Sequence, residues 1–237
     1  IHGYDGDRLT GGLGVRRARR HESLQTLDGK RRELDSEDLV ITDDTGVIGV
    51  AGVMGGASTE LSLQTSTVVV EAAHFEPVAI ARAARRHKLP SEASRRFERG
   101  VDPALPPVAA GLVVQMLADL GGATIDPALT DVDRRRPAPT IARNIGDPGR
   151  IAGRPYAPDE VVALLGEVGC SLDEPGADGE LAVTAPSWRG DLTDPVDLVE
   201  EVVRLAGYDS IPSTVPTGTA SHGLTRAQQQ EQVITRA

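Results

Sequence analysis

The sequence predicts an α+β fold in two units, a larger mixed unit followed by a small one of helices and strands. Short β-branched runs separated by turn residues alternate with segments that begin near proline and end at glycine, as helices often do. A stretch rich in arginine and proline at residues 131–139 interrupts this pattern and is typical of an exposed linker. The length of 237 residues fits one large or two ordinary domains.

The first unit is expected to begin with strands. Residues 39–42 and 46–53 are β-branched runs, and the turn signal DDTG at residues 43–46 separates them. Residues 67–73 form another apolar run, in which Glu71 is the one charged residue. We expect a buried strand there, with the Glu71 carboxylate at least partly buried.

Two helices are expected to complete the first unit, over residues 1–125. Proline favours the first turn of a helix, so Pro77 predicts a helix over residues 78–87. A second helical pattern covers residues 103–120 and ends at a pair of glycines, a common helix C-terminus.

After a linker over residues 126–139, we expect a second unit over residues 140–212. Its expected elements are a strand, a helix, a second strand and a second helix, over residues 140–143, 158–168, 181–185 and 197–205. A segment interrupted by glycine and proline follows the first strand. The polar residues 213–237 are interpreted as the start of a following domain.

Charge and composition exclude several function classes. A net charge of −10 argues against a broad nucleic-acid-binding face. The charge is uneven, about −2 over residues 1–140 and −8 over residues 141–237, and the first part carries local basic clusters. Each cluster alone is best read as solvated surface, but together they could hold one end of an RNA. Aromatic residues make up only 3%, so a platform for stacking successive bases is not expected.

Cysteine usage and hydropathy indicate a cytoplasmic protein without a membrane segment. The single cysteine, Cys170, cannot form an internal disulfide, which fits a reducing compartment. No apolar run approaches membrane-spanning length and no signal peptide is evident. The chain starts at Ile1 in what resembles the interior of a domain, so we interpret it as part of a longer protein.

Two groups of motifs carry a family resemblance. GVAGVMGGA at residues 49–57, VVVEAA at 68–73 and RRHKLPSEASRRFERGVDP at 85–103 resemble the B3/B4 editing region of the bacterial phenylalanyl-tRNA synthetase beta subunit. PSWRGD, DLVEEV and GYDSIP, which begin at residues 186, 197 and 207, are similar to the B5 domain of that subunit. The resemblance implies an N-terminally truncated editing domain followed by a B5 domain, a small winged-helix, DNA-binding-like fold.

The resemblance also implies an activity. The family charges tRNA(Phe) with phenylalanine as a cytoplasmic α₂β₂ heterotetramer of alpha and beta subunits that uses ATP and Mg²⁺. Its B3/B4 region hydrolyses mischarged tyrosyl-tRNA(Phe). Proofreading has a physical reason, because an apolar pocket rejects an added hydroxyl by only about 10². A second site that hydrogen-bonds the hydroxyl can discriminate between the two amino acids by a factor of about 10⁴–10⁵.

The editing residues are carried over position by position. The resemblance makes Glu71 the reader of the tyrosine hydroxyl and His2 a residue that positions substrate or water. Gly55 and Gly56 would line the amino-acid pocket, with Ser91 and Ala93 on its other wall. The residues alone leave rivals open: the carboxylate could be structural and paired with an arginine, and the glycines could serve only a turn or bulge.

An acidic cluster in the second unit is the other chemical feature. Asp197, Glu200 and Glu201 share one face of the expected helix, and carboxylate oxygens suit Mg²⁺. By resemblance these three residues and Asp191 hold the magnesium ion at the contact with the alpha subunit. The rival interpretation is a solvated helix N-terminus in which Asp197 serves as a cap.

No covalent nucleophile is expected, because the patterns Gly-x-Ser-x-Gly, His-Glu-x-x-His and Cys-x-x-Cys are all missing. A bound water fits better. Two further function classes stay open: an inactive scaffold that only contributes subunit contacts, and a free-standing B3/B4-like protein that binds RNA or edits in trans. Deacylation of mischarged tRNA separates the first rival from the editing hypothesis.

Overall fold

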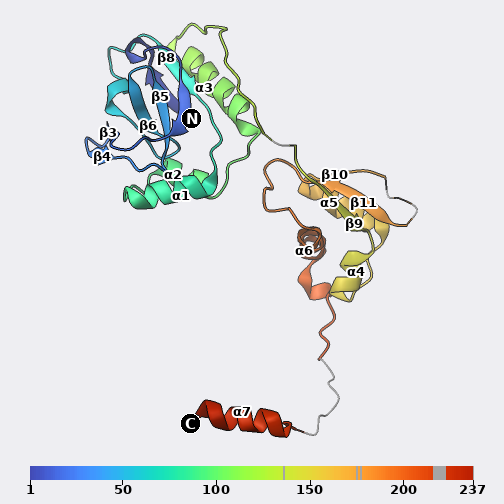
Figure 1. Cartoon of the computed structure of the whole chain (residues 1–237). Helices are drawn as coiled ribbons and strands as arrows, with labels where there is room; N and C mark the ends of the chain where they lie inside the picture. The colour runs from blue at the N-terminus through green and yellow to red at the C-terminus, as the bar shows by residue number, and fades with distance from the viewer. Residues whose placement is uncertain (136, 175, 177, 216–222, 237) are drawn as a thin grey trace.

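The computed structural model describes residues 1–135, 137–174, 176, 178–215 and 223–236. It confirms a mixed α+β protein with several antiparallel sheets (Figure 1). Two hydrophobic clusters form its cores, one from residues between Tyr4 and Phe97 and the other from residues between Ile141 and Val202. Residues 123–135 and 137–139, which follow the last helix of the first unit, carry no helix or strand. The exact boundaries of the two units stay a prediction.

The first unit is built on an antiparallel sheet in the order β2-β5-β6-β7. Figure 1 labels its two central strands, β5 and β6. The four strands are Gly14–Arg17, Leu39–Asp43, Gly46–Val50 and Met54–Gly55. The predicted β-branched runs form β5 and β6, and their side chains Val40, Ile41, Ile48 and Val50 are buried in the core. Two pairs of strands complete the unit: β1 (His2–Asp5) with β8 (Val68–Glu71), and β3 (Ser23–Gln25) with β4 (Arg31–Glu33).

The strand expected at residues 67–73 exists, but it is not buried. β8 is shorter, and its residues range from half-buried to exposed. The physical reason is its position, because β8 pairs only with β1 in a two-stranded sheet and one of its edges has no partner strand in the described part of the chain. Glu71 at its end is half-buried, as expected.

Three helices follow the strands of the first unit. α1 (Pro77–Arg86) begins at the predicted proline, and the Glu76 side chain caps it by accepting the N–H groups of Val78 and Ala79. α2 (Glu92–Glu98) was not predicted, because its seven residues give too short a periodic pattern. Two 3₁₀ turns, Gly6–Arg8 and Ala57–Thr59, lie among the strands.

α3 (Leu105–Gly121) has the predicted position and ends at Gly122, whose φ of +67° is a typical glycine cap. None of its residues is buried, although the helix is strongly apolar. Its exposed large side chains follow one another at helical spacing: Leu105, Val108, Leu112, Met116 and Leu120. The position of this helix was therefore predictable, whereas what covers its apolar face does not follow from the described residues.

A buried ion-pair cluster joins α1 to the turn before β5. The Asp38 side chain is fully buried and contacts the guanidinium of Arg86, and it lies 2.7 Å from His87 Nε2. Burial raises the pKa of Asp38, but the hydrogen bond from His87 and the backbone N–H of Asp35 outweigh it, so the pKa is lowered. His87 thus has a structural partner, and part of the predicted basic clusters is used in internal ion pairs.

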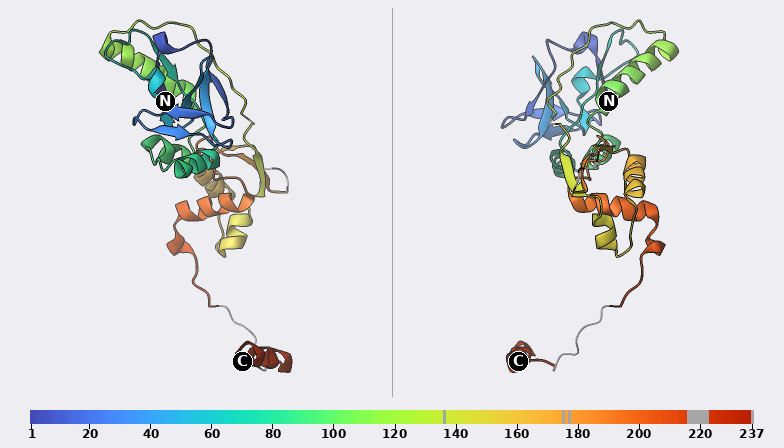
Figure 2. Two further views of the ribbon diagram at one scale, coloured as in Figure 1. Left: turned by 60° about the vertical axis from the view of Figure 1, so that its left-hand side comes forward. Right: turned by 90° about the vertical axis from the view of Figure 1, so that its right-hand side faces the viewer.

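The second unit has a small sheet in the order β10-β11-β9 (Figure 1). Its helices, yellow to orange in Figure 2, pack against this sheet. Its strands are β9 (Thr140–Asn144), β10 (Ser171–Leu172) and β11 (Glu180–Thr184). Its helices are α4 (Asp147–Ala152), α5 (Pro158–Val168) and α6 (Pro195–Ala206), followed by a 3₁₀ turn at Tyr208–Ser210. α5 matches the prediction, since Pro158 begins it and Gly169 caps it with φ +95°. Cys170 lies buried in the core, as a small apolar residue would.

Two helices of the C-terminal half differ from the prediction. α4 lies within the segment interrupted by glycine and proline, and its six residues are too few for a periodic signal. α6 begins at Pro195, two residues before the predicted start, because the cap is Asp194.

Near the C-terminus, α7 (Arg226–Arg236) has no buried residue. Among the residues that the structure describes, no helix combines the length and apolar character needed to cross a bilayer.

Candidate functional site

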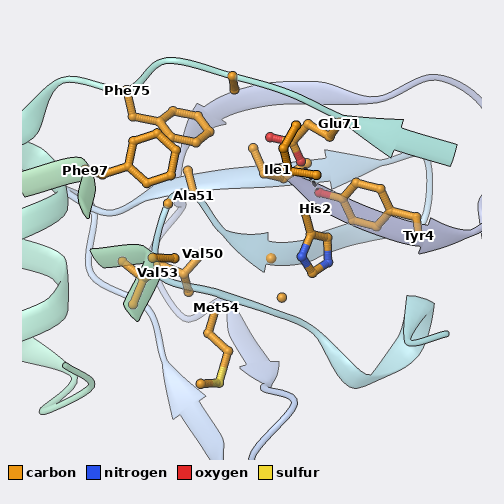
Figure 3. Close-up of a pocket in the computed structure, with 16 residues that line it drawn as sticks. Ile1, His2, Tyr4, Val50, Ala51, Val53, Met54, Glu71, Phe75 and Phe97 are labelled. Carbon is orange, nitrogen blue, oxygen red and sulfur yellow. Dashed lines mark hydrogen bonds between the residues drawn. The ribbon is translucent and has the colours of Figure 1, made fainter. Parts of the chain in front are cut away.

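A small cavity in the first unit brings together four of the six predicted editing residues, His2, Gly55, Glu71 and Ala93 (Figure 3). The cavity has a volume of about 70 Å³. This is enough for several water molecules, since one water needs about 10–15 Å³. One end of the cavity is apolar, where Phe75 and Phe97 lie with ring centroids 5.1 Å apart. The other end carries the polar side chains of His2, Tyr4 and Glu71. An apolar cavity with few polar groups is the usual form of a small-molecule site.

Strand pairing places His2 and Glu71 on the same face. The two residues lie directly opposite each other in the antiparallel pair β1–β8, so their side chains project to one side of it. Burial lowers the pKa of His2, and the nearby negative charge of Glu71 only partly opposes that effect. The imidazole is therefore neutral at physiological pH and able to accept a proton or a hydrogen bond.

Glu71 has a hydrogen-bond partner that the sequence did not indicate. The hydroxyl of Tyr4 donates to Glu71 Oε2. The structural rival pairs this carboxylate with an arginine, and no arginine contacts it in the described residues. Tyr4 is 1% exposed, and both burial and the charge of Glu71 raise the pKa of its hydroxyl. The sequence signal for Tyr4 was its spacing from His2, because residues two apart in a strand share one face.

The adjacent glycines Gly55 and Gly56 make room for different neighbours. A Cβ atom on Gly55 would lie 2.4 Å from His2 Cε1, so the imidazole ring rests against this backbone. A Cβ atom on Gly56 would lie 2.6 Å from the carbonyl oxygen of Ile48 and 2.7 Å from Leu24 Cδ1, both in the core. Gly55 lines the cavity, whereas Gly56 packs tightly against the core, which supports a structural role for that residue.

This difference makes a matched pair of substitutions informative. Gly56→Ala should destabilise the chain by about 2 kcal/mol, as overpacking of a core typically does. Gly55→Ala should cost less stability, because the His2 side chain can move away, but it should close the polar end of the cavity. Thermal unfolding of both variants checks the first effect, and hydrolysis of mischarged tRNA by the full-length protein checks the second. Equal stability losses would contradict the assignment.

Ser91 and Ala93 have separate positions near the start of α2. Ala93 lines the cavity. Ser91 is the N-cap of the helix: its hydroxyl donates to the carbonyl oxygen of Val53 at 2.6 Å and accepts the N–H of Ser94 at 3.0 Å. The hydroxyl therefore fixes α2 to the loop that precedes β7. A direct contact between Ser91 and substrate stays a prediction.

The four acidic residues predicted to hold magnesium each have another partner. Asp191 accepts from the Arg189 guanidinium at 2.6 Å, and Glu200 accepts from the Tyr208 hydroxyl at 2.9 Å. Asp197 accepts the N–H groups of Thr193 and Asp194 at 2.9 and 2.8 Å. It lies at the third position of α6 and completes a capping box with the N-cap Asp194, so the interpretation of Asp197 as the cap itself was wrong by three residues. Arg189, Thr193 and Asp194 precede α6, and Tyr208 lies in the 3₁₀ turn that follows it.

Glu201 is the most constrained of the four. It is 3% exposed and lies between two guanidinium groups, with Arg189 Nη2 at 2.8 Å from Oε1 and Arg204 Nη2 at 2.5 Å from Oε2. The hydrogen bond from Arg189, followed by that from Arg204, overcomes burial and lowers the pKa of Glu201 to about 2. Both carboxylate oxygens are therefore already used by cations of the protein.

The arrangement does not fit a magnesium ion as it stands. Throughout the described part of the chain, no group of three or more His, Cys, Asp and Glu side chains is placed to hold a metal. Two arginines adjoin Glu201, so positive charge already lies where a cation would have to bind. The assignment of Asp191, Asp197, Glu200 and Glu201 to Mg²⁺ thus depends on the resemblance alone and stays a prediction.

Comparisons with known proteins identify both units. A family model described as the B3/4 domain matches residues 1–122, and one described as the tRNA synthetase B5 domain matches residues 141–208. A phenylalanine–tRNA ligase beta subunit from Streptomyces avermitilis is 53% identical over 100% of this chain, which covers 28% of that relative. The beta subunit from Leifsonia xyli is 51% identical over 98% of the chain and 27% of the relative. The chain thus spans less than a third of the length of these relatives.

A solved structure is also similar. It is an N-terminal fragment of the phenylalanyl-tRNA synthetase beta subunit from Pyrococcus horikoshii, 14% identical, with a TM-score of 0.45. The match covers 87% of this chain and 59% of that one.

Proposed function

Because this chain belongs to the phenylalanine–tRNA ligase beta-subunit family, whose B3/4 and B5 domains it contains, we propose that its first unit removes tyrosine from mischarged tRNA(Phe). The parent protein would charge tRNA(Phe) with phenylalanine, using ATP and Mg²⁺ in the cytoplasm. Its partners would be the alpha subunit, in an α₂β₂ heterotetramer, and the tRNA itself.

One observation supports the editing role most strongly. A half-buried carboxylate, Glu71, lies at the polar end of a cavity whose opposite end is formed by two phenylalanine rings. A ring that enters this cavity finds apolar walls, and a hydroxyl on that ring finds an acceptor. A site built to hydrogen-bond a hydroxyl rejects the analogue without it far more strongly than an apolar pocket rejects the hydroxyl. The cavity therefore has the chemistry to select tyrosine over phenylalanine.

Hydrolysis needs a nucleophile, and a bound water is the candidate that fits. Cys170 lies in the other unit, where burial raises the pKa of its thiol and keeps it protonated. The neutral His2 imidazole at the same end of the cavity as Glu71 can accept a hydrogen bond from water or hold a polar group of the substrate. Water would attack the ester carbonyl, and the ribose oxygen of the tRNA would leave.

Substrate selectivity tests this function against a scaffold role. The full-length enzyme should deacylate tyrosyl-tRNA(Phe) at least about 100-fold faster than phenylalanyl-tRNA(Phe), because only the first substrate uses the acceptor. The same assay on the isolated chain shows whether this part acts alone, as a free-standing editing protein would. Equal rates for both substrates in the full-length enzyme would favour the scaffold role.

A further inference from the structure

We propose that Tyr4 is a positioning residue that holds the Glu71 carboxylate for the substrate hydroxyl and stays in place when substrate binds. This inference rests on the proposed editing function. It assigns a role to a side chain that touches no reacting atom and acts through Glu71.

Tyr4 is fixed by its surroundings. It lies in the middle of β1, opposite Val69 of β8, and its side chain is among the most completely buried in the chain. Its hydroxyl contacts Glu71 Oε2, as the dashed line in Figure 3 marks. Tyr4 borders the cavity and is only 1% exposed, so a ring that fills the cavity leaves its side chain no space to move into without disrupting the core.

The hydrogen-bonding capacity of a carboxylate leaves room for a second donor. An ionised carboxylate has two oxygens and about four lone-pair sites. Tyr4 occupies Oε2, and Oε1 has no hydrogen-bond donor among the described residues. The substrate hydroxyl can therefore donate to Oε1 while Tyr4 keeps the plane of the carboxylate fixed.

Tyr4 also explains how the Glu71 carboxylate is stabilised while the pocket is empty. A half-buried carboxylate without any partner is costly. With the Tyr4 hydroxyl always donating, Glu71 keeps one hydrogen bond when no tyrosine is bound. The ring of Tyr4 further contacts His2 edge-on, with centroids 4.6 Å apart and planes at 68°. A single side chain thus orients both polar groups of the cavity.

The test is Tyr4→Phe in the full-length enzyme, since phenylalanine keeps the buried ring and the His2 contact and removes only the hydroxyl. KM for hydrolysis of tyrosyl-tRNA(Phe) should rise on the order of tenfold, with kcat within about twofold, because the lost orientation affects binding remote from the ester. Phenylalanyl-tRNA(Phe) hydrolysis should not change. In a Glu71→Ala background, Tyr4→Phe should add almost nothing, since both changes act through one carboxylate.

Tyr156→Phe is a matched control, because the Tyr156 hydroxyl is buried in the second unit without a hydrogen-bond partner in the described residues. Unchanged kinetics of Tyr4→Phe beside an impaired Glu71→Ala enzyme would overturn the positioning role and leave the proposed function intact. Unchanged kinetics of both Tyr4→Phe and Glu71→Ala would instead refute the proposed function. A general loss of kcat for all substrates with a lowered melting temperature would make Tyr4 merely structural, which also overturns the inference.

Discussion

Replacing Glu71 by alanine in the full-length enzyme should slow hydrolysis of tyrosyl-tRNA(Phe) ten- to hundredfold. The acceptor for the substrate hydroxyl is lost, and a hydrogen bond to a charged group is worth roughly 1.5–3 kcal/mol. The loss should be largest for tyrosine and small for an amino acid without a para hydroxyl. Steady-state deacylation of the two aminoacyl-tRNAs measures the effect.

Charging of tRNA(Phe) with phenylalanine serves as the internal control and should stay nearly unchanged. Glu92→Ala is a matched control in the same unit, since the Glu92 side chain on α2 is 68% exposed and forms an ion pair with Arg96 on the helix surface. A Glu71→Ala enzyme that clears tyrosyl-tRNA(Phe) at the wild-type rate would make Glu71 structural and the pocket assignment wrong.

Glu201→Gln should destabilise the second unit by about 3 kcal/mol, the lower end of the range for breaking a buried ion pair. The amide cannot neutralise Arg189 and Arg204, which would then lie against a buried neutral group. Both arginines reach water in part, which keeps the cost from being larger. Chemical denaturation of the chain, followed at the second unit, measures the change.

The same carboxylate predicts a dependence on pH. Its folded pKa of about 2 lies below the unfolded value of 4.5, so its contribution to stability is present above about pH 4.5. That contribution is lost as the pH falls from 4.5 toward 2. The Gln variant should therefore lose less stability than the wild type over this window.

Glu200→Gln is the control for both measurements, because its one side-chain partner in the described residues is the exposed hydroxyl of Tyr208. We expect a change within about 0.5 kcal/mol. If Glu200→Gln and Glu201→Gln were equally mild, the ion pairs of the buried Glu201 with Arg189 and Arg204 would not stabilise the unit. A magnesium-dependent gain of stability in the wild type, lost in Glu201→Gln, would restore the ion-binding role.

The elements that could be predicted are those in which local signals agree with burial. β5 and β6 are β-branched runs that end at turn residues, and α5 begins at Pro158 and ends at Gly169. The short helices α2 and α4 could not be predicted, since six or seven residues show no clear period. The edge position of β8 depends on which strands pair, and local composition does not carry that information.

The candidate site was predictable only in part. His2, Glu71, Gly55 and Ala93 line one cavity, although they are widely separated in sequence. Tyr4 was missed because a tyrosine in a strand is most often a packing residue, and its hydrogen bond to Glu71 depends on the register of β1 and β8. The acidic cluster was interpreted as a set of magnesium ligands on one helix face. That interpretation considered only the acidic residues, so it missed Arg189 and Arg204, which neutralise Glu201.

A crystal structure of the full-length protein with bound tyrosine tests the central claim most directly. We expect the ring between the apolar walls near Phe75 and Phe97, and the ligand hydroxyl at about 2.5–3.0 Å from Glu71 Oε1, the usual O–H···O distance. Tyr4 should still donate to Oε2. Tyrosine bound outside this cavity, or with its hydroxyl facing away from Glu71, would contradict the assignment of this pocket as the reader of the tyrosine hydroxyl.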